Sequence, residues 1–341
     1  MIKNFLKEWN MNTILKRLLT SLGISIVIYF GLATILILVG VPREKPVQNE
    51  EAGLSFEELY FSYEALPDLQ TYAARDGVEL DYRYYPAESA DKVLILLHGS
   101  GWHSQYFLPL AEYLSGENLA HVYTPDLRGH GENPVRRGDV DYIDQYEDDL
   151  ADLIDMIRET HPDETLILGG HSSGGGLALR FGGSHYGELA DAYVLLAPFL
   201  KHNAPTARKD AGGWATPYTG RIAGLSMLNN VGIGAFNHLE VIRFNMPEEV
   251  RDGTETLAYT FRLNTAYHAE HYKKDLAAIT QPLLVLIGTA DEAFLPEQYE
   301  PTVTKHNPGA GVELLPGVNH NGIVVGEEVQ PALAAWLQGL D

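Results

Sequence analysis

The chain has 341 residues, of which 45% are hydrophobic, and it contains no cysteine. This length suffices for one large domain or two modest ones, and the lack of cysteine excludes disulfide bonds, thiolate metal ligands and a cysteine nucleophile. The formal net charge of −22 repels phosphate backbones, so we do not expect nucleic-acid binding.

The first predicted element is an apolar helix near the N-terminus. Residues 18–41 carry no charge, and a helix of this length extends about 36 Å, which is enough to cross the hydrocarbon core of a bilayer. A signal-peptide core is usually shorter and ends at a small-x-small site, whereas this run ends in Leu-Val-Gly-Val-Pro. We therefore predict an uncleaved transmembrane anchor, with a cleaved signal peptide and a buried core helix as the alternatives.

Charged residues flank this helix unequally. Residues 1–17 contain four Lys and Arg, whereas the two basic residues after the helix lie among glutamates. Because the basic flank of a membrane span tends to stay in the cytoplasm, we predict a basic cytoplasmic segment at 1–17. The single-pass anchor would then place the rest of the chain outside the cytoplasm, beginning with a polar linker at 42–65.

Beyond the linker, short apolar runs alternate with longer amphipathic stretches. Extended runs at 69–74 and 78–85 flank Arg75-Asp76-Gly77 and predict a β-hairpin. Buried strands are then predicted at 93–97, 121–123, 165–168, 193–196, 283–287 and 312–315, and helices at 107–114, 143–158, 175–181 and 327–340. This order predicts an α/β domain over 66–341, in which helices cover both faces of a mainly parallel sheet.

The alternation stops between about 200 and 272, a stretch too long for a simple loop, so we predict an inserted lid subdomain. It is rich in aromatic residues, and Ile222–Asn237 contains no charged residue. These apolar side chains form the insert's own small core, line a pocket for an apolar substrate or touch the bilayer beside the anchor. For the pocket interpretation, the substrate-binding candidates in the insert are Leu225, Leu228 and Phe236.

A glycine-rich turn follows the predicted strand at 165–168. Gly170-His171-Ser172-Ser173-Gly174 matches G-x-S-x-G between a strand and a helix, which is the context of a nucleophile elbow. A phosphate-binding loop would need a following Gly-Lys-Ser/Thr, and a dinucleotide loop would need G-x-G-x-x-G. We therefore predict that Ser172 is a catalytic nucleophile.

A serine nucleophile needs a base and a carboxylate that orients it, and in this architecture both follow the serine, with the acid first. Asp291 comes directly after the strand at 283–287, and His320 comes after the strand at 312–315. The carboxyl ends of parallel strands share one sheet edge, where such sites lie. As alternatives, Asp291 is a turn residue with Glu292 as the carboxylate, or His320 is a surface histidine.

An oxyanion needs two donors arranged before the reaction. The backbone N–H groups of Ser173, at the helix start, and of Ser100, in the loop His98-Gly99-Ser100-Gly101-Trp102, are the candidates. Trp102 in the same loop is a further substrate-binding candidate, although a plain glycine turn remains the alternative for this loop. No metal and no organic cofactor is needed for this chemistry.

With these motifs, residues 66–341 resemble the α/β-hydrolase superfamily, in its monoacylglycerol lipase/lysophospholipase-like (serine aminopeptidase-like) branch. The matching residues are the His98–Gly101 loop, Asp126-Leu127-Arg128-Gly129-His130-Gly131, the elbow, the Asp291 turn and His320. The resemblance implies the α/β-hydrolase fold with an eight-stranded sheet, a lid after the sixth strand, and hydrolysis of acyl esters through an acyl-enzyme. It also implies that the motif beginning at Asp126 is structural, so His130 is not a catalytic candidate.

The leading hypothesis is a membrane-anchored serine hydrolase acting on a lipid-like ester, such as a monoacylglycerol or lysophospholipid. The same triad serves acyltransferases, thioesterases and peptidases, which therefore remain alternatives. A non-catalytic protein that binds a ligand in the lid pocket is a further alternative.

Overall fold

The computed structural model describes residues 2–41, 53–208 and 213–340. By its internal contacts, the chain forms two compact units. The smaller unit comprises Met1–Lys45 and Pro217–Val241, and the larger one comprises Pro46–Thr216 and Ile242–Asp341.

The larger unit contains an eight-stranded sheet with the order β1-β2-β4-β3-β5-β6-β10-β11. Its strands are β1 (Gln70–Ala73), β2 (Glu79–Tyr85), β3 (Lys92–Leu97), β4 (His121–Pro125), β5 (Thr165–His171), β6 (Ala192–Leu196), β10 (Leu283–Gly288) and β11 (Gly311–Leu315). The β1–β2 and β2–β4 pairs are antiparallel, whereas the other five pairs are parallel. The predicted hairpin and mainly parallel sheet are confirmed.

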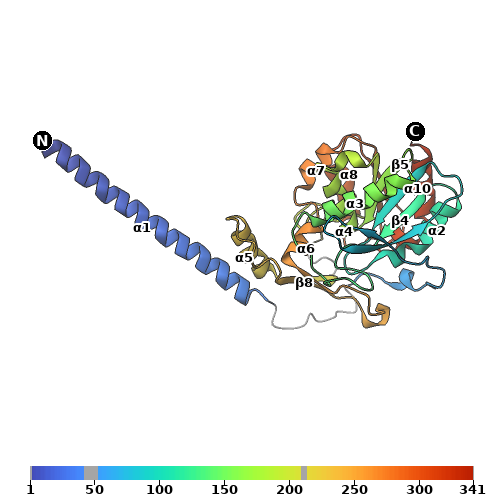
Figure 1. The fold of residues 1–341 in the computed structure, drawn as a ribbon, viewed down its shortest axis with the longest axis horizontal. Helices are drawn as coiled ribbons and strands as arrows, with labels where there is room; N and C mark the ends of the chain where they lie inside the picture. Colours follow the sequence, from blue (N-terminus) through green and yellow to red (C-terminus); the bar gives the residue numbers. More distant parts are fainter. Residues whose placement is uncertain (1, 42–52, 209–212, 341) are drawn as a thin grey trace. The chain divides into compact units, whose positions relative to one another are not determined.

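Helices cover both faces of this sheet (Figure 1). Helix α4 packs on β5 and β6 and contacts α7, whereas α2, α9 and α10 pack against one another. The helices of this unit are α2 (Leu108–Gly116), α3 (Gln145–Thr160), α4 (Ser173–Gly182), α6 (Phe261–Ala266), α7 (Tyr272–Ala278), α8 (Tyr299–Val303), α9 (Gly322–Val325) and α10 (Val329–Gln338). Short 3-10 turns lie at Glu57–Leu59, Ser104–Phe107, Gly187–Leu189, Glu248–Val250 and Pro296–Gln298.

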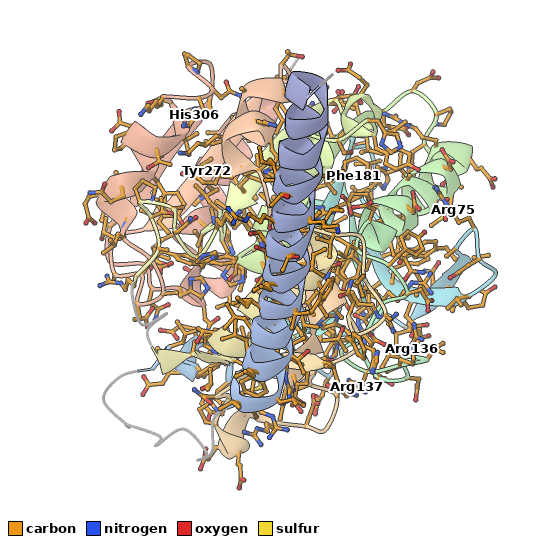
Figure 2. All side chains as sticks on the ribbon, turned by 90° about the vertical axis from the view of Figure 1, so that its left-hand side faces the viewer. Arg75, Arg136, Arg137, Phe181, Tyr272 and His306 are labelled. Carbon is orange, nitrogen blue, oxygen red and sulfur yellow. The ribbon has the colours of Figure 1, made fainter. Side chains whose placement is uncertain are left out.

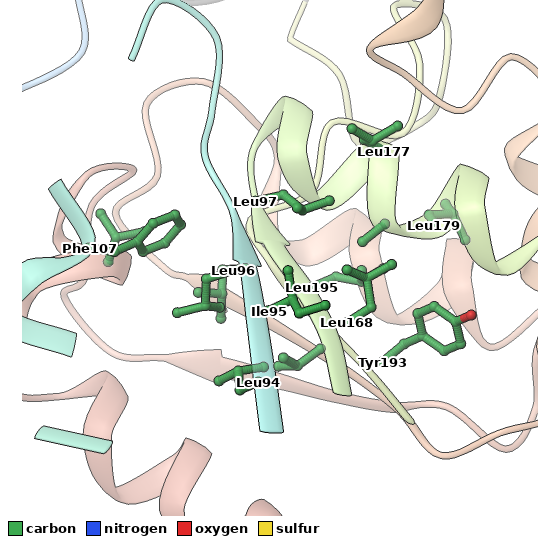
Figure 3. Close-up of a cluster of buried hydrophobic side chains, with 14 of the residues drawn as sticks. Leu94, Ile95, Leu96, Leu97, Phe107, Leu168, Leu177, Leu179, Tyr193 and Leu195 are labelled. Atoms are coloured by element: carbon green, nitrogen blue, oxygen red, sulfur yellow. The ribbon is translucent and has the colours of Figure 1, made fainter. Parts of the chain in front are cut away.

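The core lies where the central strands meet these helices (Figure 3). All side chains from Val93 to Leu97 on β3 are 0% exposed, as are Leu168 on β5 and Leu195 on β6. A parallel strand that is covered on both faces has no polar side to alternate with. For that reason these strands read as unbroken apolar runs in the sequence.

At the edge of the sheet, the hairpin turn is joined to α3. Arg75, labelled in Figure 2, pairs with Asp148 at 2.7 Å and with Asp152 at 2.8 Å. The Asp-Gly turn predicted from the sequence therefore also positions a cation over the acidic first half of α3.

The segment before β1 differs from the predicted linker. Phe56 and Leu59 are only 7% and 5% exposed and belong to the core of the larger unit. Their three-residue spacing places both side chains on one side of a helical turn, which buries them together. Residues 42–52 of the predicted linker lie outside the described residues.

After β6, the insert contains a three-stranded sheet in the order β7-β8-β9. The strands are β7 (Ala215–Pro217), β8 (Glu240–Phe244) and β9 (Ala258–Thr260). Between β7 and β8 the chain forms α5 (Thr219–Asn229), which packs with α1 (Ile2–Val39) in the smaller unit. Within α1, residues Thr13–Val39 are long and apolar enough to cross a membrane.

Candidate active site

Ser172 forms the whole turn between β5 and α4. Its backbone has φ +54° and ψ −117°, a region that a non-glycine residue rarely adopts. Three backbone hydrogen bonds hold it there: its N–H donates to Leu196 O at 2.9 Å, and its carbonyl accepts from Gly176 N at 3.0 Å and Phe199 N at 2.8 Å. The surroundings therefore impose the strained conformation expected of a nucleophile elbow.

Close backbone contacts explain the two glycines of the elbow. A Cβ at Gly170 would lie 2.5 Å from the carbonyl carbon and oxygen of Gly174. A Cβ at Gly174 would collide with the carbonyl oxygens of Leu97 and His98. Only glycine at both positions lets β5, α4 and the end of β3 approach this closely.

Asp291 and His320 form a buried pair at the carboxyl end of the sheet. His320 Nδ1 lies 2.7 Å from Asp291 Oδ2, and the two residues are 3% and 2% exposed. The other oxygen, Asp291 Oδ1, accepts from the N–H groups of Ala293 at 2.8 Å and Phe294 at 2.7 Å. With the carboxylate fixed in this way, Nδ1 of His320 is the protonated nitrogen, which leaves Nε2 as the basic one.

His320 also lies against the residue that precedes Ser172. His171 Nε2 donates to the His320 carbonyl oxygen at 3.0 Å, and the two imidazole rings are 4.6 Å apart. His320 also packs against Phe294 in a T-shaped arrangement, with 5.2 Å between ring centroids. The structure thus brings the loops of Ser172, Asp291 and His320 together at the ends of β5, β10 and β11.

Glu292, the alternative acid, contacts the backbone rather than the imidazole. Its Oε2 accepts from His320 N at 2.9 Å, and its Oε1 accepts from Ser55 N at 3.0 Å. Asn319 and Asn321, on either side of His320, donate to Glu58 and to the Ser55 carbonyl. Sequence reasoning missed Ser55 and Glu58, because nothing in the local sequence before the first strand indicates contact with a loop more than 200 residues later.

The candidate oxyanion loop and the elbow are in direct contact. Ser100 Oγ and Ser173 Oγ share a hydrogen bond of 2.7 Å. The N–H groups of Gly99 and Gly101, on either side of Ser100, donate to the hydroxyls of Tyr106 at 2.7 Å and Tyr259 at 2.8 Å. Ser173 is the first residue of α4, where a helix leaves its N–H groups without intrahelical partners. This geometry suits the two predicted donors.

Buried side chains hydrogen-bond to this loop and to the elbow beside it. Tyr106 donates to His171 Nδ1 at 3.0 Å, and burial, with the nearby His320, holds the pKa of His171 well below its usual value. Burial likewise lowers the pKa of His98 to about 4. Both imidazoles are therefore neutral near pH 7, and they act as fixed hydrogen-bond partners.

The motif that begins at Asp126 lies behind the same loop. Asp126 Oδ1 accepts from Ser104 N at 2.7 Å, and Leu127 N donates to His98 Nε2 at 3.1 Å. Arg128 makes two hydrogen bonds to Asp149, at 2.8 and 2.7 Å. These contacts connect the motif to the loop and to α3, which is the structural role that the resemblance implies.

The four substrate-binding candidates divide between the two units. In the larger unit, Trp102 is 6% exposed and stacks on Tyr106 with 5.9 Å between ring centroids. In the smaller unit, Leu225 and Leu228 are buried on α5, whereas Phe236 is 48% exposed. A substrate-binding role for these four residues stays a prediction.

A surface hollow and the distribution of possible metal ligands do not indicate a second active site among the described residues. A hollow of about 720 Å³ is lined by Thr165 and Ala192, the first residues of β5 and β6, and by Pro282, directly before β10, and thus lies at the edge opposite to Ser172. Among the described residues, no group of three or more His, Asp or Glu could hold a metal ion.

Comparison with known proteins identifies the family of this chain. Residues 88–323 match the family described as serine aminopeptidase, S33. Human monoglyceride lipase is 28% identical over 242 residues, which cover 67% of this chain and 74% of the human protein.

Two solved structures share the fold. A soluble variant of Saccharomyces cerevisiae monoglyceride lipase, in complex with a substrate analogue, matches with a TM-score of 0.62 and 17% identity, over 82% of this chain and 98% of its own. A membrane phospholipase A described as a bacterial virulence factor matches with a TM-score of 0.54 and 19% identity, over 96% of this chain and 98% of its own. The chain therefore belongs to the serine aminopeptidase S33 family and has the α/β-hydrolase fold.

Proposed function

We propose that this protein is a membrane-anchored serine hydrolase that cleaves acyl esters of monoacylglycerol or lysophospholipid type through an acyl-enzyme. The observation that carries the proposal is the buried Asp291–His320 pair, 2.7 Å apart, at the same sheet edge as Ser172 on its strained turn. Active sites of open α/β sheets lie at this edge, so a buried and paired carboxylate and imidazole here support a catalytic role.

In the proposed reaction, His320 Nε2 takes the proton of Ser172 Oγ while the oxygen attacks the acyl carbonyl carbon. Asp291 stabilises the resulting imidazolium and keeps its Nδ1–H directed at the carboxylate. The backbone N–H groups of Ser100 and Ser173 stabilise the oxyanion, and one such donor typically contributes about 10²–10³ in kcat. His320 then protonates the leaving alcohol, and water releases the acyl group by the same steps in reverse.

The substrate class and the anchor have separate support. The name of the human relative, monoglyceride lipase, favours a glyceride ester, and the absence of charge from Ile222 to Asn237 favours an apolar substrate or surface. The apolar helix Thr13–Val39 supports anchoring, and its basic N-terminal flank favours a catalytic domain outside the cytoplasm.

The test is hydrolysis of monoacylglycerols, lysophospholipids and short aryl esters by the detergent-solubilised full chain. We expect the specificity constant to rise with acyl length over several carbons, because each buried CH₂ contributes up to about 0.8 kcal/mol. Ser172→Ala provides the matched control, since it removes one hydroxyl from an ordered turn. A preference for acetyl over longer acyl groups would contradict the lipid substrate. If Ser172→Ala hydrolysed these esters as the wild type does, the proposed mechanism would be contradicted.

A further inference from the structure

Helix α5 of the insert covers one stripe of the membrane-spanning candidate α1. On α1, Ala33 is 0% and Ile37 is 9% exposed, whereas neighbours such as Leu32 and Leu38 are 48% and 72% exposed. Ala33, Ile37 and Gly40 repeat at a spacing of three to four residues, which defines a single helical face. The large apolar side chains of α1 from Ile14 to Ile28 are exposed.

Specific contacts define the direction of α5 along α1. Near the C-terminal end of the span, Arg221 Nε donates to the Ile37 carbonyl at 3.2 Å. Further back along the span, Tyr29 donates its hydroxyl hydrogen to the Met227 carbonyl at 2.6 Å. As the numbering of α5 rises, the numbering of α1 falls, so α5 runs antiparallel to α1.

The two helices approach closely because both present small residues. A Cβ at Gly224 would lie 2.7 Å from the Ala33 carbonyl oxygen and 2.8 Å from Ile37 Cγ1, and a Cβ at Gly220 would lie 2.8 Å from Gly40 Cα. Glycine and alanine at a helix contact are typical of packing inside membranes, where burial of apolar surface gives no drive for association.

Two asparagines of the α5 segment satisfy each other's side-chain amides. Asn229 and Asn237 form a reciprocal pair of side-chain hydrogen bonds at 2.7 and 2.9 Å, and Asn229 also donates to the Leu225 carbonyl at 2.9 Å. In contrast, Val231 and Phe236, between the two asparagines, are 51% and 48% exposed. Amides that satisfy one another beside exposed apolar side chains suit a hydrocarbon surrounding better than water.

The charged residues Arg221 and Glu240 lie at the end of this segment that is nearest to the C-terminus of α1. Arg221 donates to the carbonyls of Ile37 and Glu240, and Tyr218 donates to the Glu240 carboxylate at 2.6 Å. These groups lie at the level where α1 ends, which is where charged and aromatic residues anchor a span at the membrane surface.

From these observations we propose that residues 222–237 form a re-entrant hairpin that enters the bilayer beside α1. The contacts extend from Gly40 back to Tyr29, and a helix covers about 16 Å over that interval, or about half of a hydrocarbon core of ~30 Å. The occupant of the exposed face is the acyl-chain region of the leaflet nearest to the catalytic domain. This inference rests on the proposed membrane anchoring of α1.

The absence of native cysteine permits a direct test with single-cysteine reporters in the full chain. Val231→Cys and Phe236→Cys report on the hairpin, Val27→Cys reports on the span, and Val135→Cys, at a position 79% exposed in the larger unit, reports on water. Each variant is labelled with an environment-sensitive fluorophore and reconstituted into phosphatidylcholine vesicles. Quenching is then compared between doxyl-labelled lipids and aqueous iodide.

We expect labels at 231 and 236 to be quenched by the doxyl lipids as the label at 27 is, and the label at 135 to be quenched only by iodide. Iodide quenching at 231 and 236, with lipid quenching at 27, would overturn the hairpin and leave the anchor intact. Iodide quenching at all four positions would show that the anchoring itself fails, and the hairpin with it.

A second pair of variants tests whether α1 holds the hairpin. Gly224→Ile adds a side chain against Ala33 and Ile37, whereas Gly31→Ile adds the same side chain on α1, where a Cβ meets nothing within 4 Å. We expect Gly224→Ile to shift the label at 231 from lipid quenching to iodide quenching, and Gly31→Ile to leave it unchanged. Equal behaviour of the two variants would contradict this packing.

Discussion

Replacing Asp291 with Asn tests the proposed triad without removing an atom from the core. In the structure, Asp291 Oδ1 accepts two backbone hydrogen bonds, from Ala293 and Phe294, while Oδ2 faces His320 Nδ1 at 2.7 Å. An asparagine oxygen can keep the two backbone bonds, which places the NH₂ group toward His320. The imidazole must then accept at Nδ1 and carry its proton on Nε2, where it cannot act as the base.

The expected loss follows from this tautomer change. The corresponding substitution in a serine-protease triad lowers kcat about 10⁴-fold, which corresponds to about 5.5 kcal/mol of transition-state stabilisation. The folded state should lose much less, because the retained hydrogen bonds change from charge-assisted to neutral at a cost of about 1 kcal/mol each. We therefore expect a near-complete loss of kcat with a melting temperature lowered by only a few degrees.

The assay is hydrolysis of a soluble p-nitrophenyl ester by detergent-solubilised wild type and Asp291→Asn, with thermal unfolding measured on the same samples. Retention of a tenth or more of the wild-type kcat would refute the tautomer argument. If activity and melting temperature instead collapsed together, Asp291 would be a structural turn residue, as its alternative interpretation holds.

Three further predictions follow from other contacts. Glu292→Gln should lower kcat/KM only about tenfold or less, because its oxygen still accepts one of two backbone N–H groups; a loss equal to that of Asp291→Asn in the same ester assay would reassign the acid. Burial lowers the pKa of His98 from its usual 6.5 to about 4. As the pH falls, this imidazole is therefore protonated in the unfolded chain before it is protonated in the folded protein. The resulting stabilisation is present above pH 6.5 and is lost toward pH 4, at up to about 1.4 kcal/mol per pH unit; a constant melting temperature from pH 7.5 to 5 would contradict it. Deletion of residues 1–45 removes the partner of α5, so the truncated protein should aggregate without detergent, and a monodisperse detergent-free protein in size-exclusion chromatography would contradict that expectation.

The central strands β3, β5, β6 and β10 were predictable because they are buried on both faces. Each apolar run, such as 93–97, became a strand with ends within a few residues of the predicted ones, since no polar position interrupts a central parallel strand. The 3-10 turn at Glu57–Leu59 was not predictable in this way. The buried side chains of Phe56, which precedes the turn, and Leu59 find their partners only in the folded core, and the local sequence does not show that they pack there.

The candidate site likewise has residues that the local sequence predicts and contacts that depend on distant segments. The elbow at Ser172 follows from a short motif, and the positions of Asp291 and His320 follow from strand ends. By contrast, the contacts of Glu292 with the backbone of Ser55 and His320 join three distant segments. The pattern of α5 likewise shows an apolar face but does not identify α1, nearly 200 residues earlier, as its partner.

The central claim is that Ser172 carries the acyl group during turnover. Its most direct measurement is mass spectrometry of the enzyme quenched with acid during hydrolysis of a slowly deacylating p-nitrophenyl ester, followed by peptide mapping. The account predicts one added acyl group on the peptide that contains Ser172, and none in Ser172→Ala. An acyl group on another residue, or full activity of Ser172→Ala with no adduct on either protein, would contradict the account.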